Sequence, residues 1–397
     1  MAATLFVQVI SSLAAATIPL MGPLLTQKWG LPATSIGYAS AASSAGICWF
    51  LACGNSMLDH YGPIRTIQIG LLALVLGLVV FLLPLGAIGL SGALLFGLGV
   101  APNIPAGSQV LMRTAPPRHR TLVFSIKQAG MPLGGMIAGL IIPALVAGMG
   151  FNAGLFVLIA MLVMSAALVQ PFQRALDGEK GHGDRAWPRH FLSPSSLRRA
   201  VAVIRLNREL PILTLICVSF SVAQSSTTAY TATYMVTEHG KSLLEAGQYM
   251  AVFLGASALA RILFGWIADR TGKGTILFAS LGLATGVALL LLISPIGSHP
   301  VFVYACMIMA GATTMGWNGV FMAEIARSSP PSQVGPVTSA VNLFGFFGSI
   351  SGPLVFAVTA TLTGGFVWPF VIIALQAALV GLTALWLLRR PPTTIAH

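Results

Sequence analysis

Two basic residues, Lys127 and Arg261, lie in long apolar stretches of this 397-residue chain that otherwise carry almost no charge. An arginine offers a planar fork that binds a carboxylate through two parallel hydrogen bonds, and a lysine supplies a mobile point charge. Two cations at similar depth would repel each other unless an anion lay between them. These residue types therefore indicate a site for a carboxylate-like or phosphonate-like anion.

Each of these cations also has a structural interpretation. Arg261 could be held by an acid in a loop or by backbone carbonyl groups. The long stem of Lys127 could instead extend its ammonium group to the lipid headgroups. The sequence leaves both interpretations open.

The acidic residues and histidines leave little room for other chemistry. Of the nine acids, only Glu324 approaches an apolar stretch, where pairing with Arg327 accounts for it, and the seven histidines lie in loops or the tail. A carrier of cationic compounds usually presents a carboxylate inside the membrane, and a proton-coupled symporter commonly uses one to carry the proton. The stretches also contain no metal-ligand cluster, nucleophile-base pair or phosphate loop. We therefore expect a transporter without cofactor or metal, rather than a membrane-embedded enzyme or receptor.

Membrane-spanning helices must position these residues. The chain is 56% hydrophobic and 8% charged, against roughly 25% charged residues in soluble domains. Four runs contain no Asp, Glu, Lys or Arg: 66–112, 128–173, 274–323 and 328–388. Each is about twice the roughly 20 residues that one membrane-spanning helix needs. Each run therefore predicts a helical hairpin, with turns at 84–92, 148–152, 295–300 and 363–365.

Four further apolar segments, 3–23, 36–56, 210–236 and 247–267, bring the expected number of spans to twelve. The stretches are continuously apolar, which excludes the alternating pattern of a β-barrel. With the amino terminus inside, the predicted cytoplasmic loops hold 17 of the 21 Lys and Arg residues, as the positive-inside rule requires. We therefore expect a multi-pass protein of the inner membrane with both termini in the cytoplasm. The net charge of +12 then implies no nucleic acid partner.

The two halves of the chain are related by an internal repeat. Matching residues first lie 210 apart and later 214 apart: Gly30 and Gly240, Gly37 and Gly247, Asp59 and Asp269, Gly62 and Gly272, Arg113 and Arg327, Ser125 and Ser339, Gly134 and Gly348. The repeat predicts one six-helix bundle at 1–174, a cytoplasmic linker at 175–209 and a second bundle at 210–397. Apolar residues and arginines at helical spacing in 195–208 indicate an amphipathic helix on the membrane surface, with a basic disordered linker as the alternative.

A loop motif occurs at the same place in both halves. Residues 265–273 read GWIADRTGK, and residues 55–65 read NSMLDHYGPIR, which keeps the aspartate, the later glycine and one cation but has His60 in place of the arginine. The two copies resemble the G-x-L-A-D-R-x-G-R signature of the major facilitator superfamily, and the resemblance covers essentially the whole chain. It implies an all-α integral membrane protein with twelve transmembrane helices in two pseudo-symmetric six-helix bundles that work by alternating access.

The same resemblance implies residues that control the conformation of the protein rather than bind its substrate. In this family the signature aspartate is similar to a latch that pairs with cations and a helix N-terminus and favours the state closed on the cytoplasmic side. The expected gate residues are Asp59, Arg65, Arg113, Asp269, Arg270 and Lys273.

Two further segments resemble known patterns. Residues 260–265, ARILFG, are similar to helix 8 of monocarboxylate transporters and oxalate/formate antiporters, in which that arginine binds the substrate carboxylate. Those families place the second charged partner on helices other than helix 5, so Lys127 lies outside the match. The glycines of segment 130–139 look like a motif of drug antiporters, but we interpret them as a face that packs against other helices.

Polar residues complete the candidate site. In the resembled fold, helices 1, 4, 7 and 10 line the central cavity; span 7 is unusually polar, and prolines beside Asn103 indicate a distorted helix 4 with freed carbonyl groups. The expected substrate-binding residues are Arg261, Lys127, Gln128, Asn103, Gln224, Ser225, Thr228, Thr231, Tyr234, Asn318 and Asn342. Each uncharged member could instead form a hydrogen bond between helices.

We predict a monomeric secondary transporter that moves a small organic anion through the lipid bilayer. Efflux of neutral or lipophilic compounds is the alternative. A coupling proton carried by the substrate's own carboxyl group, an exchanged anion and facilitated diffusion all stay open.

Overall fold

The computed structural model describes residues 2–83, 86–114, 120–177, 204, 209–272, 274–294, 300–329 and 334–389. The described part of the chain is almost entirely helical and contains no β-strand. Its first part forms α1 (Ala2–Ala15), α2 (Thr17–Leu20), α3 (Gly22–Lys28), α4 (Ile36–Cys53), α5 (Asn55–Tyr61), α6 (Pro63–Leu82), α7 (Gly92–Val100), α8 (Asn103–Thr114), α9 (Arg120–Met149), α10 (Phe151–Val169) and α11 (Gln173–Leu176). Its second part forms α14 (Glu209–Thr237), α15 (Leu243–Thr271), α16 (Gly274–Leu292), α17 (Pro300–Met315), α18 (Trp317–Ser328), α19 (Val334–Thr363) and α20 (Val367–Arg389).

Within the described ranges, nine helical segments are long and apolar enough to cross a membrane. The segments Ile276–Leu292 and Val367–Thr383 are shorter apolar helices, and the span predicted after residue 300 is divided at Gly316 into α17 and α18. Two of the predicted reversals lie within the described residues, at Gly150 (φ 85°) between α9 and α10 and at Gly364 (φ 72°) between α19 and α20. The prediction of an all-helical integral membrane protein is confirmed.

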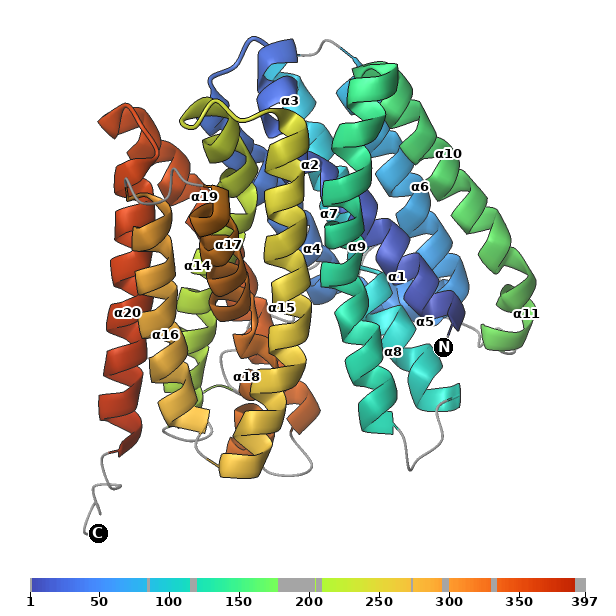
Figure 1. Ribbon diagram of the computed structural model, residues 1–397. Helices are drawn as coiled ribbons and strands as arrows, with labels where there is room; N and C mark the ends of the chain where they lie inside the picture. The colour runs from blue at the N-terminus through green and yellow to red at the C-terminus, as the bar shows by residue number, and fades with distance from the viewer. Residues whose placement is uncertain are drawn as a thin grey trace.

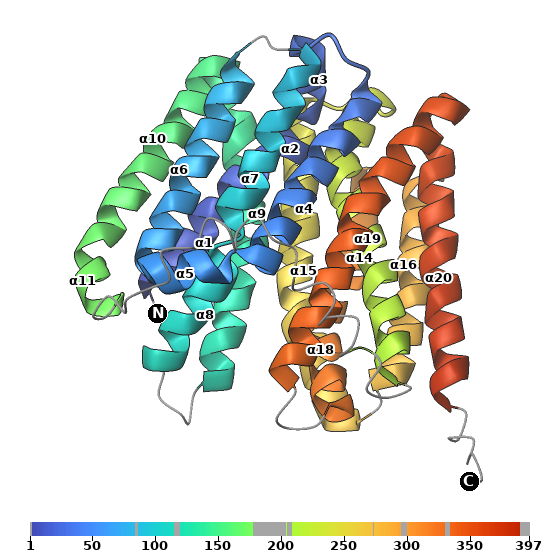
Figure 2. The same ribbon diagram turned by 180° about the vertical axis from the view of Figure 1, so that it is seen from behind.

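The helices form two groups. Figures 1 and 2 show the helices of residues 2–177 on one side of the molecule and those of residues 209–389 on the other. The amino terminus lies toward the face that the charge distribution predicts to be cytoplasmic, and α3 lies at the opposite face, here called the predicted outer face. The most extensive contacts between the groups are those of α9 with α15 and of α4 with α19, and α14 also packs on α2, α3 and α4.

The repeated glycines adopt equivalent conformations in the two groups. Gly30 and Gly240 have φ values of 66° and 60°, and Gly62 and Gly272 have φ values of 82° and 62°. Only glycine adopts this region without steric cost. The internal repeat inferred from the sequence is therefore visible in the backbone itself.

Other repeated glycines lie where helices approach most closely. Gly134 lies against the carbonyl oxygen of Val9 on α1, and its repeat partner Gly348 lies against that of Val218 on α14. A Cβ atom at Gly139 on α9 would lie 2.6 Å from the carbonyl oxygen of Gly247 on α15. Small residues permit such approach in lipid, where no hydrophobic effect drives helices together. The glycine-rich segment of α9 is thus a packing face, as interpreted from the sequence.

The pair α9 and α15 is tightest in the half nearer the predicted outer face. Gly135 packs on Leu254 and Gly255 packs on Met136. Further along α15, Ile262 has an exposed fraction of 60%. The two helices diverge toward the predicted cytoplasmic face, as both views show (Figures 1 and 2).

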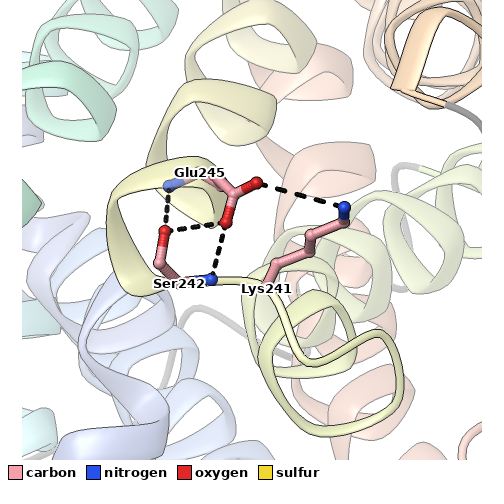
Figure 3. Close-up of polar contacts among 3 residues, drawn as sticks. All are labelled: Lys241, Ser242 and Glu245. Atoms are coloured by element: carbon pink, nitrogen blue, oxygen red, sulfur yellow. Dashed lines mark hydrogen bonds and ion pairs between the residues drawn. The ribbon is translucent and has the colours of Figure 1, made fainter.

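A capping box fixes the start of α15 (Figure 3). The Oγ atom of Ser242 accepts a hydrogen bond from the backbone amide of Glu245 at 3.2 Å, and Oε2 of Glu245 accepts one from the amide of Ser242 at 2.9 Å. The ammonium of Lys241 lies 4.0 Å from the same carboxylate. These bonds satisfy backbone amides that a helix N-terminus leaves unbonded, and they define the first turn of the helix that carries Arg261.

Tyr230 on α14 joins the two groups near the predicted outer face. Its hydroxyl group donates to the carbonyl oxygen of Thr34, 2.7 Å away, and lies 3.3 Å from that of Pro353. The ring is fully buried and stacks on Phe356 with centroids 3.9 Å apart. The hydrogen bond from the Tyr230 hydroxyl to Thr34 is therefore part of the contact between the two helix groups near the predicted outer face.

We expect Gly139→Ala to destabilise the protein, because the added Cβ would meet the backbone of α15, which cannot yield as a side chain can. Overpacking of this kind costs about 1–3 kcal/mol. Unfolding in detergent with increasing SDS measures the effect. Gly148→Ala is the matched control on the same helix, since a Cβ there meets nothing within 4 Å. Equal stability of the two variants would contradict the packing role of Gly139.

We expect Tyr230→Phe to open the outer side more often, because the variant keeps the ring but loses a hydrogen bond worth about 1 kcal/mol. A cysteine at buried Thr233, in a background where the four native cysteines are serine, should react about fivefold faster with a maleimide. Tyr249→Phe is the control, because the Tyr249 ring lies against Tyr304 within the same helix group. An unchanged labelling rate in Tyr230→Phe would show that the hydroxyl does not hold the contact.

Candidate functional site

The division between α17 and α18 creates a polar centre. Met315 ends α17, so its carbonyl oxygen belongs to those that a helix end leaves without a regular backbone donor. Two side chains supply donors instead. Nδ2 of Asn318 lies 3.0 Å from this oxygen, and Nε of Arg261 on α15 lies 3.3 Å from it.

Gln224 on α14 extends this centre. Its Oε1 accepts a hydrogen bond from Nε1 of Trp317 at 3.2 Å and one from Nδ2 of Asn318 at 3.4 Å. The indole ring is itself fixed, because it stacks on Phe220 with centroids 5.6 Å apart and meets Phe321 edge-on at 5.2 Å. Three of the residues singled out in the sequence, Arg261, Gln224 and Asn318, are therefore brought together by one chain of hydrogen bonds.

Several polar atoms of this cluster remain available. The bond from Nε to Met315 is the backbone-carbonyl arrangement considered for Arg261 from the sequence, yet it uses only one nitrogen of the guanidinium. Among the described residues, neither Nη atom of Arg261, nor Nε2 of Gln224, nor Oδ1 of Asn318 has a partner. All three side chains are partly exposed. The cluster thus presents a cation, an amide donor and a carbonyl acceptor.

The helix that corresponds to α17 and α18 in the first half is also divided. It breaks after Val100 into α7 and α8, and Nδ2 of Asn103 donates to the carbonyl oxygen of Val100 at 3.2 Å. In both halves an asparagine therefore bonds the last carbonyl of the preceding helix from three residues further on. Asn103 is 2% exposed, and its Oδ1 has no partner among the described residues. The distortion predicted from the prolines is confirmed.

Lys127 on α9 bonds to the helix that follows this break. Its Nζ donates to the carbonyl oxygen of Ile104 at 3.0 Å and lies 3.4 Å from Oγ of Ser108. The residue is 3% exposed. Extension of the ammonium to the lipid headgroups, one interpretation of the sequence, is therefore wrong.

The two intramembrane cations do not confront each other across the α9–α15 pair. Lys127 turns toward α8 and Arg261 turns toward the α17–α18 break, because each is drawn to backbone carbonyl groups of its own helix group. An anion lodged directly between them, as the sequence suggested, does not follow from this arrangement. By the register of the pair, Gln128 is the residue of α9 at the level of Arg261. It lies seven residues before Gly135, and Arg261 lies seven after Leu254, the residue on which Gly135 packs.

The polar residues of α14 divide into two sets. Ser225 and Thr228 are partly exposed and lie within one turn of Gln224, although their hydroxyls donate to the carbonyl oxygens of Val222 and Gln224. Thr231 is fully buried and donates to Thr227, and Tyr234 is buried against the ring of Phe370. Asn342 on α19 is partly exposed. Of the polar residues of α14, Ser225 and Thr228 therefore lie near the cluster, whereas Thr231 and Tyr234 are buried further along the helix.

The expected gate residues lie only partly within the description. Asp59 and Arg270 are exposed, and the guanidinium of Arg270 lies 5.1 Å from the ring of Trp266. Nη1 of Arg65 donates to Gln68 at 3.3 Å. The side chains of Arg113 and Asp269, and all of Lys273, lie outside the described residues. The predicted pair of Glu324 and Arg327 is confirmed at 2.9 Å.

Asp177, assigned to the linker from the sequence, caps the first turn of α6. Its Oδ1 accepts from the amide of Ile64 at 2.6 Å and its Oδ2 from that of Arg65 at 3.3 Å. Burial raises the pKa of this carboxyl group, and the two amide bonds act in the opposite direction. A helix that starts at Pro63 after a positive-φ glycine needs such a cap, but nothing in the sequence indicates that it comes from residue 177. Trp317 and Tyr230 were missed for the same reason, since their partners lie about 93 and 196 residues away.

Comparisons with known proteins agree with this architecture. A family model described as Major Facilitator Superfamily matches residues 4–353. The chain is 28% identical over 352 residues to a probable nitrate/nitrite transporter, NarK2, of Mycobacterium tuberculosis, which covers 86% of this chain and 84% of that protein. It is 26% identical over 162 residues to a hexuronate transporter of Bacillus subtilis, covering 39% of this chain and 36% of the relative.

Solved structures show the same fold at low sequence identity. A bacterial homologue of the human lysosomal transporter Spinster, in an inward-facing and unoccupied conformation, matches with a TM-score of 0.77 and 14% identity over 98% of each chain. A POT family transporter matches with a TM-score of 0.77 and 14% identity over 97% of this chain and 95% of that one. With the family model spanning most of its length, this chain belongs to the major facilitator superfamily and is a membrane transporter.

Proposed function

We propose that this transporter carries a small organic anion and that Arg261 binds the anionic group. The observation that supports this most strongly is the guanidinium itself. It lies partly buried inside a membrane protein, donates through one nitrogen only, and has no carboxylate partner among the described side chains. A charge held at such a depth is costly unless a partner compensates it. A transported anion would supply that partner through the two Nη atoms.

The neighbouring groups favour an organic anion that also bears hydroxyl groups. Nitrate and nitrite can only accept hydrogen bonds, whereas Oδ1 of Asn318 needs a donor. A hydroxylated carboxylate would accept from Nε2 of Gln224 and donate to Asn318, so that each available atom of the cluster found a partner. The named relatives carry anions of both kinds, nitrate or nitrite in one case and a hexuronate in the other.

The internal repeat also supports a site with a single strong anchor. The residue 210 positions before Arg261 is Leu51, so the first half offers no equivalent arginine. An anion therefore meets an asymmetric site, with the charged contact on α15 and the orienting contacts on α14 and α18. We place the protein in the inner membrane as a monomer with both termini in the cytoplasm, and it works by alternating access between its two helix groups.

Uptake into proteoliposomes tests the proposal, with labelled D-glucuronate, lactate, nitrate and nitrite as probes. We expect wild-type protein to carry a carboxylate, and Arg261→Gln to reduce its uptake about 30-fold or more. The loss of a buried, hydrogen-bonded charge costs roughly 2 kcal/mol or more. Glutamine can still donate to the Met315 carbonyl, so this variant removes the charge and keeps the structural bond.

Arg174→Gln is the matched control, because Arg174 is an exposed arginine on α11, in the helix group that does not contain Arg261. Arg261→Lys should retain part of the activity, since it keeps the charge without the planar fork. Wild-type uptake by an Arg261→Gln variant would refute the anchor. Export of a lipophilic dye by a protein that carries none of the four anions would refute the proposal in favour of efflux.

A further inference from the structure

Lys127 is a buried ionisable residue that the proposed anion site does not use. It lies in the first helix group, on the side of α9 that faces α8, and is 3% exposed. Gly107 makes room for it, because a Cβ atom there would lie 2.7 Å from Cε and 2.9 Å from Nζ of the lysine. The amine is therefore held against the backbone of α8, away from the Arg261 cluster.

The hydrogen-bond partners of Lys127 suit a neutral amine better than an ammonium group. An ammonium has three hydrogens to donate, and a neutral amine has two. The described surroundings offer two acceptors, the carbonyl oxygen of Ile104 at 3.0 Å and Oγ of Ser108 at 3.4 Å. One hydrogen of the charged form is thus left without a partner among the described atoms.

Lys28 shows what a satisfied ammonium looks like in the same protein. Its Nζ donates to the carbonyl oxygen of Leu82 at 2.8 Å, to that of Phe81 at 3.3 Å and to Oδ1 of Asn152 at 3.3 Å, and it lies 4.6 Å from the ring centre of Phe151. Three acceptors match its three hydrogens. The contrast lies in the number of acceptors, since both lysines bond to backbone carbonyls.

No acidic side chain is described close to Lys127. The helices that pack on α9 are α1, α2, α8, α10 and α15. The first two and α10 contain no charged or titratable residue, and α8 contributes only Arg113, whose side chain lies outside the description. On α15, Glu245 belongs to the capping box at the predicted outer face, Tyr249 lies against Tyr304, Arg270 lies over Trp266, and the side chain of Asp269 is not described. The remaining titratable residue of α15 is Arg261, a cation.

We propose that Lys127 carries a coupling proton, so that the protein is a proton–anion symporter. This proposal rests on the anion site proposed above. The step is a simple protonation in which the lone pair of the neutral Nζ accepts H⁺ from water on one side of the membrane and later returns it to water on the other side. No electron is transferred and no covalent bond between heavy atoms changes. The buried setting admits a proton, whereas an anion of several atoms would have to separate α8 from α9.

The link between the proton and the anion is electrostatic. Lys127 and Arg261 lie on α9 and α15, at the end of the pair where the two helices diverge, and in low-dielectric surroundings charges interact more strongly across such a separation than they do in water. While Arg261 is without its anion, its positive charge disfavours a second charge on Lys127. An anion bound to Arg261 cancels that repulsion and favours protonation of Lys127. By reciprocity, a protonated Lys127 strengthens anion binding, so that anion and proton travel together.

Proteoliposomes containing a pH-sensitive dye test the inference, with D-glucuronate and lactate as probes. Wild-type protein should acidify the lumen when the anion enters, and an inward proton gradient should raise anion accumulation. Lys127→Arg should lose gradient-driven accumulation at least tenfold, because arginine keeps the charge but does not release its proton. Exchange of labelled for unlabelled anion, which needs no net proton movement, should fall less than threefold. Lys28→Arg is the matched control and should retain both activities.

Lys127→His separates proton transfer from a purely structural role. Histidine can still be protonated, so this variant should keep proton coupling with its pH optimum moved toward acid. If Lys127→Arg proves unstable, Lys127→Met provides the same comparison without the larger side chain. Full proton-driven accumulation by Lys127→Arg or Lys127→Met refutes the inference. Anion uptake by wild-type protein without proton movement refutes it as well, while leaving the anion site intact. Absence of any anion transport refutes both proposals.

Discussion

The structure depends on one constraint, which is that a polar group inside a bilayer must find its partner within the protein. Two of the membrane helices are divided, between α7 and α8 and between α17 and α18, and each break leaves a carbonyl oxygen without a regular donor. Asn103 and Asn318 supply amide donors, and each asparagine lies three residues after the carbonyl that it bonds. Lys127 and Arg261 then bond to carbonyls on either side of the same breaks. The two helix breaks therefore position Lys127 and Arg261.

The repeat explains which features belong to the common scaffold and which are particular to this chain. The positive-φ glycines, the close contacts of Gly134 and Gly348 and the asparagines at the breaks occur in both halves. The cations do not. Leu51 stands at the repeat position of Arg261, and Val341 stands at that of Lys127. The two cations thus lie on α9 and α15, one of the helix pairs that form the interface between the halves.

The sequence alone predicted features that follow from local composition. It did not predict toward which neighbouring helix a side chain projects. Charge-free runs and turn residues located the helices, and the repeat located the packing glycines, because both signals are written in consecutive residues. The side of α9 on which Lys127 projects depends on Gly107, a residue that looks unremarkable until α8 is placed beside it. Likewise, the sequence shows Gln224 as one of many polar residues of α14. Its place in the Arg261 cluster depends on hydrogen bonds from Trp317 and Asn318, which lie over 90 residues away.

Lys127 and Arg261 differ in acid–base chemistry, and the proposed proton coupling depends on that difference. An arginine stays protonated at every step of transport, so it can bind an anion but cannot take up or release a proton when the anion binds. In the proposed mechanism, the lysine with its two acceptors takes either the neutral or the charged form, according to the charge at Arg261. Because both residues lie on the helix pair whose close glycine contacts face the predicted outer side, any rocking about those contacts moves the two sites relative to each other. The glycine contacts hold α9 and α15 together toward the predicted outer face, and the two cations lie beyond them, where the helices diverge.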